Sequence, residues 1–141
     1  MAVRAALPAL RYGRQYQRPI SNFGAPFALA AAGELITWSR ILDDEETLCV
    51  VNGNGAQNRG ADVLVDASLN SPAAPGRTPG GAPFMQVVVN SAQAAAVASG
   101  SPYTGVHPAG QKLPVLNSNG TSFVQIRDLP PAEVLVLTNR P

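Results

Sequence analysis

The only dense cluster of carboxylates in the sequence is the run Asp43-Asp44-Glu45-Glu46. Two carboxylates can hydrolyse a glycoside when they face each other across a sugar, about 5 to 9 Å apart. This run stands between two apolar segments, a position that predicts the tight, solvated turn of a β-hairpin. Because side chains on such a turn have no pocket around them, we interpret the run as a polar turn and not as a catalytic pair.

His107 is the only histidine, so any Ser-His-Asp triad has to use it. Ser101 lies nearby in the sequence, but Gly100-Ser101-Pro102 is not the Gly-x-Ser-x-Gly turn that exposes a nucleophilic serine. We therefore expect His107 to be a loop residue without a catalytic role. One histidine and one cysteine, Cys49, are too few for a structural zinc centre, and neither a metal nor a cofactor is predicted.

Aromatic side chains are the second type of residue that indicates a chemistry, because aromatic rings stack on the apolar faces of sugars. Trp38 and Tyr103 are the candidate carbohydrate-binding residues. Trp38 lies in a segment with a strand pattern, where a core position is the commoner role. Tyr103 stands between Pro102 and Thr104 in a loop, which predicts a more exposed ring.

The composition indicates a single domain with few charges. The 141 residues are a usual domain size, 45% of them are hydrophobic, 13% are charged, and the net charge is +1. A surface with so few charges resists self-association poorly. Four arginines precede the first acid, Glu34, but without lysine clusters or a recognisable module they do not predict nucleic-acid binding; they are Arg4, Arg11, Arg14 and Arg18.

No apolar stretch reaches the roughly 18 residues of a membrane-spanning helix. Pro8 and Arg11 interrupt the N-terminal apolar stretch that a signal peptide needs. The sequence therefore predicts no membrane partner and a cytoplasmic location.

Short strand patterns separated by Gly-, Pro- and Asn-rich turns make up most of the chain. The predicted strands are 34–42, 47–52, 61–66, 84–90, 113–116, 122–127 and 133–138. No helical patterns alternate with them, which excludes a parallel α/β sheet. We predict an all-β fold, an antiparallel two-sheet β-sandwich with Greek-key connections. Residues 70–83 predict a long loop, and residues 92–98 a helical turn or an irregular loop.

The N-terminal region has a different pattern. Pro8 predicts a short helix with the proline in its first turn, ended by Gly13. The small residues up to Gly33 predict a loop. The chain therefore divides into an N-terminal arm at 1–33, which is a short helix or extended arm, and a β-sandwich domain at 34–141.

The order of these segments resembles the C-terminal all-β domain of α-amylase-family enzymes, glycoside hydrolase family 13. The N-terminal segment Pro8–Tyr16 resembles the exit from the last helix of the catalytic barrel in such enzymes. The segments that resemble the β domain are Glu34–Asn52, Arg59–Asp66, Phe84–Asn90, His107–Gly110, Leu113–Val115 and Ile126–Leu137. The barrel, which carries the catalytic carboxylates in that family, is absent, so the resemblance transfers no catalytic residue.

The resemblance implies a non-catalytic accessory domain with a structural role, packing against a catalytic barrel. It places Tyr12 and Tyr16 near that barrel, and with Phe23 and Phe27 they form the expected interface. Alone, the chain is expected to form a homo-oligomer through this orphaned surface. Two alternatives remain open: a module that binds starch-like oligosaccharides, and a small hydrolase with a site formed from His107 and Ser101 at an oligomer interface.

Overall fold

A computed structural model of the chain describes residues 2–22, 26–70, 83–118 and 120–139. The predicted loop at 70–83 therefore lies almost entirely outside the described residues. The predicted interface residue Phe23 also lies outside them. The helices in these ranges are α1 (Ala2–Ala6), α2 (Pro8–Tyr12) and α3 (Ser91–Ala98). The strands are β1 (Arg14–Gln17), β2 (Ile20–Ser21), β3 (Leu35–Leu42), β4 (Glu45–Asn52), β5 (Arg59–Val65), β6 (Phe84–Asn90), β7 (Lys112–Pro114), β8 (Leu116–Ser118), β9 (Thr121–Leu129) and β10 (Val134–Thr138).

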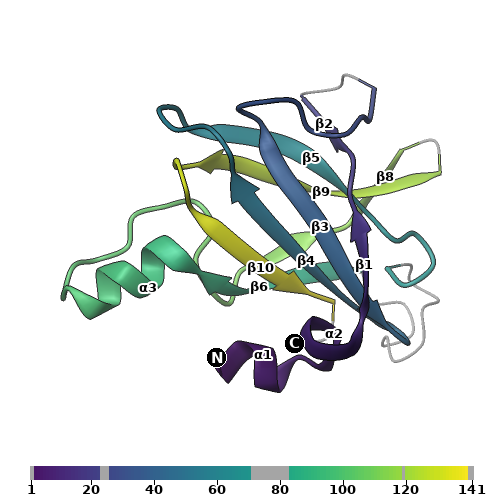
Figure 1. The fold of residues 1–141 in the computed structure, drawn as a ribbon, viewed down its shortest axis with the longest axis horizontal. Coiled ribbons are helices and arrows are strands. Elements are labelled where there is room, and N and C mark those ends of the chain that lie inside the picture. The colour runs from purple at the N-terminus through teal and green to yellow at the C-terminus, as the bar shows by residue number, and fades with distance from the viewer. Residues whose placement is uncertain (1, 23–25, 71–82, 119, 140–141) are drawn as a thin grey trace.

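The strands form two antiparallel sheets that pack face to face (Figure 1). The larger sheet has six strands in the order β1-β3-β4-β10-β6-β7, and the smaller has four in the order β2-β5-β9-β8. Among the described strands, the chain changes sheets between β1 and β2, β2 and β3, β4 and β5, β5 and β6, β7 and β8, and β9 and β10. The predicted all-β two-sheet sandwich is confirmed.

The core lies between the inner faces of the two sheets, where alternate residues of each strand meet. On the larger sheet, Leu48 and Val50 of β4 pair with Leu137 and Leu135 of β10, and all four are fully buried. On the smaller sheet the inner residues include Ala61, Val63, Val65, Val124 and Ile126. Each such aliphatic side chain contributes about 1.5–3 kcal/mol by leaving water, except for the smaller alanine.

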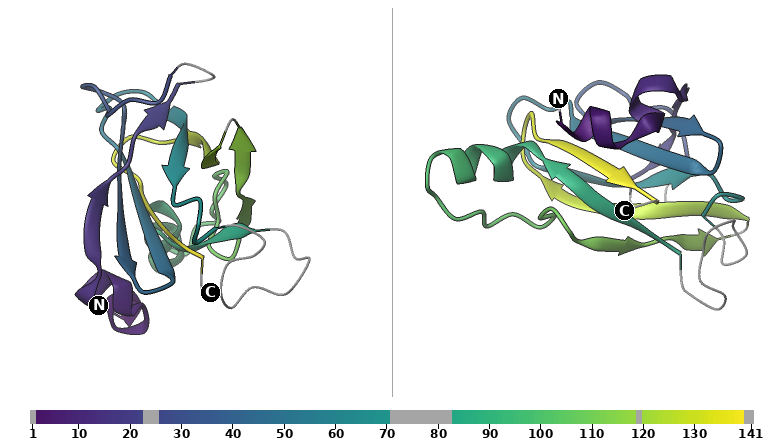
Figure 2. Two further views of the ribbon diagram at one scale, coloured as in Figure 1. Left: turned by 90° about the vertical axis from the view of Figure 1, so that its right-hand side faces the viewer. Right: turned by 90° about the horizontal axis from the view of Figure 1, so that it is seen from below.

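The N-terminal arm contributes an edge strand to each sheet. β1 pairs with β3 in the larger sheet, and β2 pairs with β5 in the smaller. As predicted, α2 begins with Pro8 in its first turn, and its C-cap is Gly13. Figure 2 shows α1 and α2 on the outer side of the larger sheet, away from the smaller one. The division of the chain at residue 33 stays a prediction.

The predicted strand at 113–116 is two strands in different sheets. β7 forms the edge of the larger sheet beside β6, and β8 forms the edge of the smaller sheet beside β9. Pro114 lacks the N–H of a ladder donor, which confines it to an edge. Between the two strands, Val115 N donates to Pro83 O at 3.1 Å, and the chain passes from one sheet to the other.

Candidate functional site

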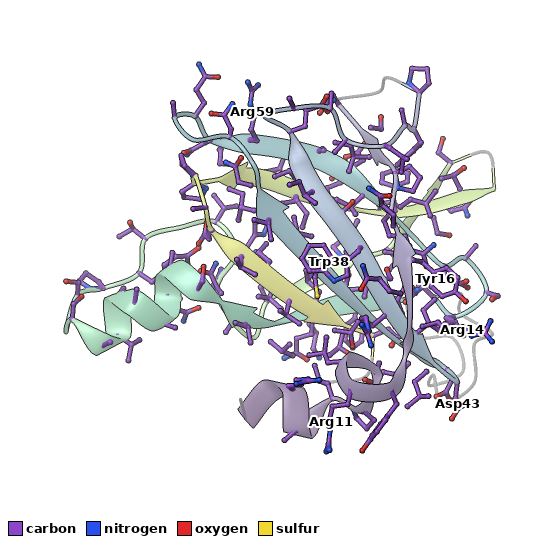
Figure 3. The ribbon with its side chains drawn as sticks, in the orientation of Figure 1. Arg11, Arg14, Tyr16, Trp38, Asp43 and Arg59 are labelled. Atoms are coloured by element: carbon purple, nitrogen blue, oxygen red, sulfur yellow. The ribbon has the colours of Figure 1, made fainter. Side chains whose placement is uncertain are left out.

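The outer face of the larger sheet is apolar over much of its area. In register across the strands, Ile36 pairs with Val51 and Val51 with Val134, while Trp38 pairs with Cys49 and Cys49 with Val136. Ile36 is 46% exposed, and Trp38 and the three valines are half-buried. Figure 3 shows Trp38 in front of this sheet, near its centre. We call the six residues Ile36, Trp38, Cys49, Val51, Val134 and Val136 the outer apolar face.

α2 covers only the hairpin end of this side of the sheet. Its Ala9 is fully buried, and Ala9 N donates to Glu45 Oε1 at 3.2 Å. Gly13 follows at a close approach, since a Cβ there would lie 2.6 Å from Ala9 O and 2.8 Å from Ile41 O. The helix is therefore held at one end of the sheet, and among the described segments it leaves the outer apolar face beside it open.

Cys49 is the most buried residue of this face and pairs with Trp38 across β3 and β4. Burial raises the pKa of its thiol to about 11, and the Arg40 guanidinium opposes the rise. The thiol is therefore protonated near neutral pH, and a protonated thiol is a poor nucleophile. Cys49 acts as a small apolar side chain that fills the sheet surface.

Trp38 and Tyr103, the two predicted carbohydrate-binding residues, lie apart. Trp38 is on β3, whereas the Tyr103 hydroxyl accepts from Asn90 Nδ2 at 2.8 Å at the end of β6. Two strands, β4 and β10, separate β3 from β6, which sets the two sites about 14 Å apart across the sheet. The structure does not bring the two rings into one stacking platform.

The Tyr103 hydroxyl both accepts and donates a hydrogen bond within the protein. It donates to Glu133 Oε1 at 3.1 Å, and Asn90 Nδ2 also donates to His107 O at 2.8 Å, which ties the loop to the sheet. Burial and the neighbouring Glu133 carboxylate raise the pKa of Tyr103. Glu133 Oε2 is buried and has no hydrogen-bond partner within the described part of the chain. Tyr103 therefore anchors the loop with its polar end.

His107 is buried, with both ring nitrogens occupied. Its Nε2 accepts from Arg127 N at 2.9 Å, so Nδ1 carries the proton and donates to Gln111 Oε1 at 2.8 Å. Arg127 lies on β9 beyond the residues that pair with β8. The histidine therefore accepts a hydrogen bond from a backbone N–H of β9 that β8 does not reach. Ser101 is exposed, and the hydrogen bond described for its Oγ is to Ser99 at 3.4 Å. The structure does not pair Ser101 with His107.

The acidic run is not a uniformly solvated turn, and this prediction was wrong for Glu46. The turn itself is Asp43-Asp44, and Glu45 and Glu46 belong to β4. Glu46 has the same strand parity as Leu48 and Val50, so its side chain points between the sheets and is fully buried. That parity with the apolar residues is the signal in the sequence that identifies its burial.

Four hydrogen bonds satisfy the Glu46 carboxylate. Oε1 accepts from Arg18 Nη2 at 2.8 Å and from Ser39 Oγ at 2.6 Å. Oε2 accepts from Asp66 N at 3.0 Å and from Asn70 Nδ2 at 2.7 Å. Every lone-pair direction that a substrate would use is taken, so Glu46 serves structure and leaves no free acid or base.

The three predicted interface residues that the structure describes do not form one surface. Tyr12 is 66% exposed at the end of α2, with the Arg11 guanidinium 5.0 Å from its ring centroid. Tyr16 is 42% exposed on the edge strand β1. Phe27 instead packs against Phe123 of β9, with ring centroids 5.9 Å apart. Phe123 belongs to the smaller sheet, so Phe27 lies on a different part of the sandwich from Tyr12.

The outer apolar face was missed as a site by the sequence-based reasoning, although its signal is present. Strand 134–138 is apolar at both parities, and so is most of 47–51. A strand with one solvent-exposed face alternates between apolar and polar residues, whereas a strand covered on both faces is apolar throughout. The continuous apolar runs therefore indicate a sheet with two apolar faces, of which the sandwich covers one.

No helix within the described ranges is both long enough and apolar enough to cross a membrane. Comparisons of the chain with protein-family models, with curated proteins and with solved structures find no match. The resemblance to the amylase-type β domain accordingly stays a prediction.

Proposed function

We propose that this chain is a non-catalytic accessory β-sandwich domain, and that its role is to pack against the catalytic barrel of an α-amylase-type glycoside hydrolase. The observation that carries the proposal is the position of the outer apolar face beside α1 and α2. The segment Pro8–Tyr16 resembles the exit from a barrel helix, and its helical part, α2, lies on the same side of the larger sheet as this open face. A barrel that precedes the arm would therefore stand over the apolar residues.

The energetics favour a partner on this face. The exposed Ile36 lies in register with a half-buried tryptophan and three half-buried valines on one sheet surface, and contiguous apolar patches of this kind mark protein interfaces. Trp38 has the largest side chain of the face, and a tryptophan that dominates an interface commonly contributes 2 kcal/mol or more, about thirtyfold in affinity. The rest of the face supplies shape and excludes water.

The test uses the fact that Trp38 is the only tryptophan. The chain is labelled with 5-fluorotryptophan and titrated with an unlabelled barrel from an α-amylase-type enzyme whose own C-terminal domain has been deleted. We expect the single ¹⁹F signal to shift as Trp38 becomes buried, and the melting temperature of the barrel to rise because binding stabilises the folded state.

Ile36→Ser is the test variant, and Val97→Ser is its matched control. Val97 is 72% exposed on α3, outside the outer apolar face. We expect Ile36→Ser to weaken binding roughly tenfold, since it removes apolar contact area, and Val97→Ser to leave binding unchanged. An unchanged ¹⁹F signal at about 100 μM barrel, well above the Kd expected of a specific interface, would contradict the proposal.

A further inference from the structure

A polar cleft lies at the end of the sandwich where β3 and β5 begin. It encloses about 710 Å³, within the usual range of small-molecule sites. Four separate segments line it: the end of β2, the residues before β3, the residues that enter β5, and the end of β9. Its polar lining residues are Asn22, Glu34, Asn58, Arg59, Arg127 and Asp128. Figure 3 shows Arg59 at the opposite end of the molecule from Arg11 and Arg14.

A β-bulge shapes the cleft. The register between β5 and β9 shifts between Arg59 and Ala61, and the intervening Gly60 lies against the opposite backbone. A Cβ on Gly60 would be 2.7 Å from Ile126 O, so this close approach requires glycine. On the facing strand, Asp128 is in the left-handed region with φ of 47°. Bulges redirect side chains out of the regular ladder, and here two ionised residues at the bulge line the cleft.

Several of these polar groups have unused hydrogen-bonding capacity. Within the described residues, Asn58, Arg59 and Asp128 make no side-chain hydrogen bond or ion pair. Glu34 accepts one hydrogen bond at Oε2, from Asn22 Nδ2 at 2.5 Å. Arg127 differs, because its Nη2 donates to Asp62 Oδ1 at 2.9 Å, which fixes its guanidinium.

The charged groups that remain in the lining indicate the class of ligand. Because the Arg127 guanidinium is paired with Asp62, the other charged groups of the lining are one guanidinium, of Arg59, and two carboxylates, of Glu34 and Asp128. An anion would meet both carboxylates, and a cation would meet the Arg59 guanidinium. A hydroxyl both donates and accepts, and it is matched by carboxylates that only accept, guanidinium groups that only donate and amides that do both.

We propose that this cleft binds a neutral, hydroxyl-rich ligand, an oligosaccharide, with Arg59 donating to its hydroxyls and Glu34 and Asp128 accepting from them. The site is distinct from the outer apolar face, and the inference does not rest on the packing role. It also differs from the predicted pair Trp38 and Tyr103, because it recognises the hydroxyls of a sugar without requiring an aromatic platform.

The experiment is a titration of the ¹⁵N-labelled chain with maltotriose, followed by amide chemical shifts. We expect progressive shifts of the amides of Arg59, Gly60 and Asp128 at about 10 mM ligand, where a millimolar site is nearly saturated. Inorganic phosphate at the same concentration is the anionic probe, and we expect it to leave these amides in place. Shifts centred on Trp38, no shift with maltotriose, or tighter binding of phosphate would each overturn the inference.

Two substitutions test the assigned roles. Asp128→Asn keeps a residue that tolerates the left-handed region and removes the carboxylate, and Arg59→Ala removes the donor. Hydrogen bonds to charged groups are the stronger ones, so we expect each variant to bind maltotriose roughly tenfold more weakly. Arg14→Ala, which removes an exposed arginine at the other end of the molecule, is the matched control and should bind as the original chain does. Equal affinity of all three variants for maltotriose would contradict the roles assigned to Arg59 and Asp128. Unchanged melting temperatures confirm that the variants are folded.

Discussion

Glu46 joins segments that are far apart in the sequence. Its carboxylate holds Arg18 from the arm, Ser39 from β3 and Asn70 from the turn after β5. Its backbone N–H donates to Asn139 Oδ1 at 2.9 Å, so the end of β10 is tied to the same residue. A buried charge of this kind is stable only when paired and fully hydrogen-bonded, as it is here.

Replacing Glu46 with glutamine should destabilise the protein strongly. The amide leaves the Arg18 guanidinium, which is largely buried, without its counter-charge and turns an acceptor into a donor that faces other donors. Breaking such a pair by changing one partner costs about 3–5 kcal/mol. Urea denaturation followed by circular dichroism measures the change, with Asp43→Asn as the control. Asp43 is in the exposed turn with φ of 53°, which asparagine also tolerates, so the control should unfold at the original midpoint. Equal midpoints for the two variants would show that the network is unimportant.

The residues of this network show what single-residue patterns can and cannot reveal. The alternation Glu46-Leu48-Val50 indicates an inward-facing position, and the buried carboxylate could have been identified from it. Its partners could not, because the chain separations of the contacts range up to 93 residues between Glu46 and Asn139. His107 is similar: its loop position was predicted, but its contact with Arg127 depends on where β8 ends.

At the level of elements, the contact between α2 and the hairpin of β3 and β4 positions the arm. Gly13 makes this contact possible, because its missing side chain lets two backbone segments meet. We predict that Gly13→Ala destabilises the protein by about 1–3 kcal/mol, since the obstructing atoms, Ala9 O and Ile41 O, belong to the backbone.

The matched control for this prediction is Gly55→Ala. Gly55 lies in the turn after β4, and a Cβ there would meet nothing within 4 Å. The free energy of unfolding of the Gly55→Ala variant should be unchanged or slightly raised, because alanine restricts the conformations of the unfolded chain. Urea midpoints of the two variants are compared, and hydrogen exchange at α2 reports whether the helix detaches first. Indistinguishable midpoints would mean that α2 is not held by this approach.

The elements themselves were largely predictable. Strand 84–90 was predicted with the bounds that β6 has, because its apolar run ends at Asn90, which caps the helix α3 that follows. The short edge strands β1, β2 and β8 were not predicted, since two to four residues carry too little pattern and form only because a neighbour supplies hydrogen bonds. The bulge at Gly60 also depends on a partner strand, β9, that lies far along the chain.

At the scale of the whole molecule, the sandwich separates two kinds of surface. The core between the sheets uses one face of each strand, and on β3, β4 and β10 the apolar residues of the other parity form the outer apolar face. The open end of the sandwich forms the polar cleft from four segments that no sequence spacing connects. The sandwich class was therefore predictable from alternation, whereas the cleft required knowledge of which strand ends meet.

This arrangement predicts self-association when no larger partner covers the outer apolar face. Only 13% of residues are charged and the net charge is +1, so little repulsion opposes contact between two copies. We expect light scattering at about 50 μM, in the range where modest interfaces are populated, to give a mass above the 14.6 kDa of one chain. Ile36→Lys places a charge on the face and should restore the single-chain mass. Val97→Lys adds the same charge on α3, away from the face, and should associate as the original chain does. A single-chain mass for the unchanged protein would contradict the prediction.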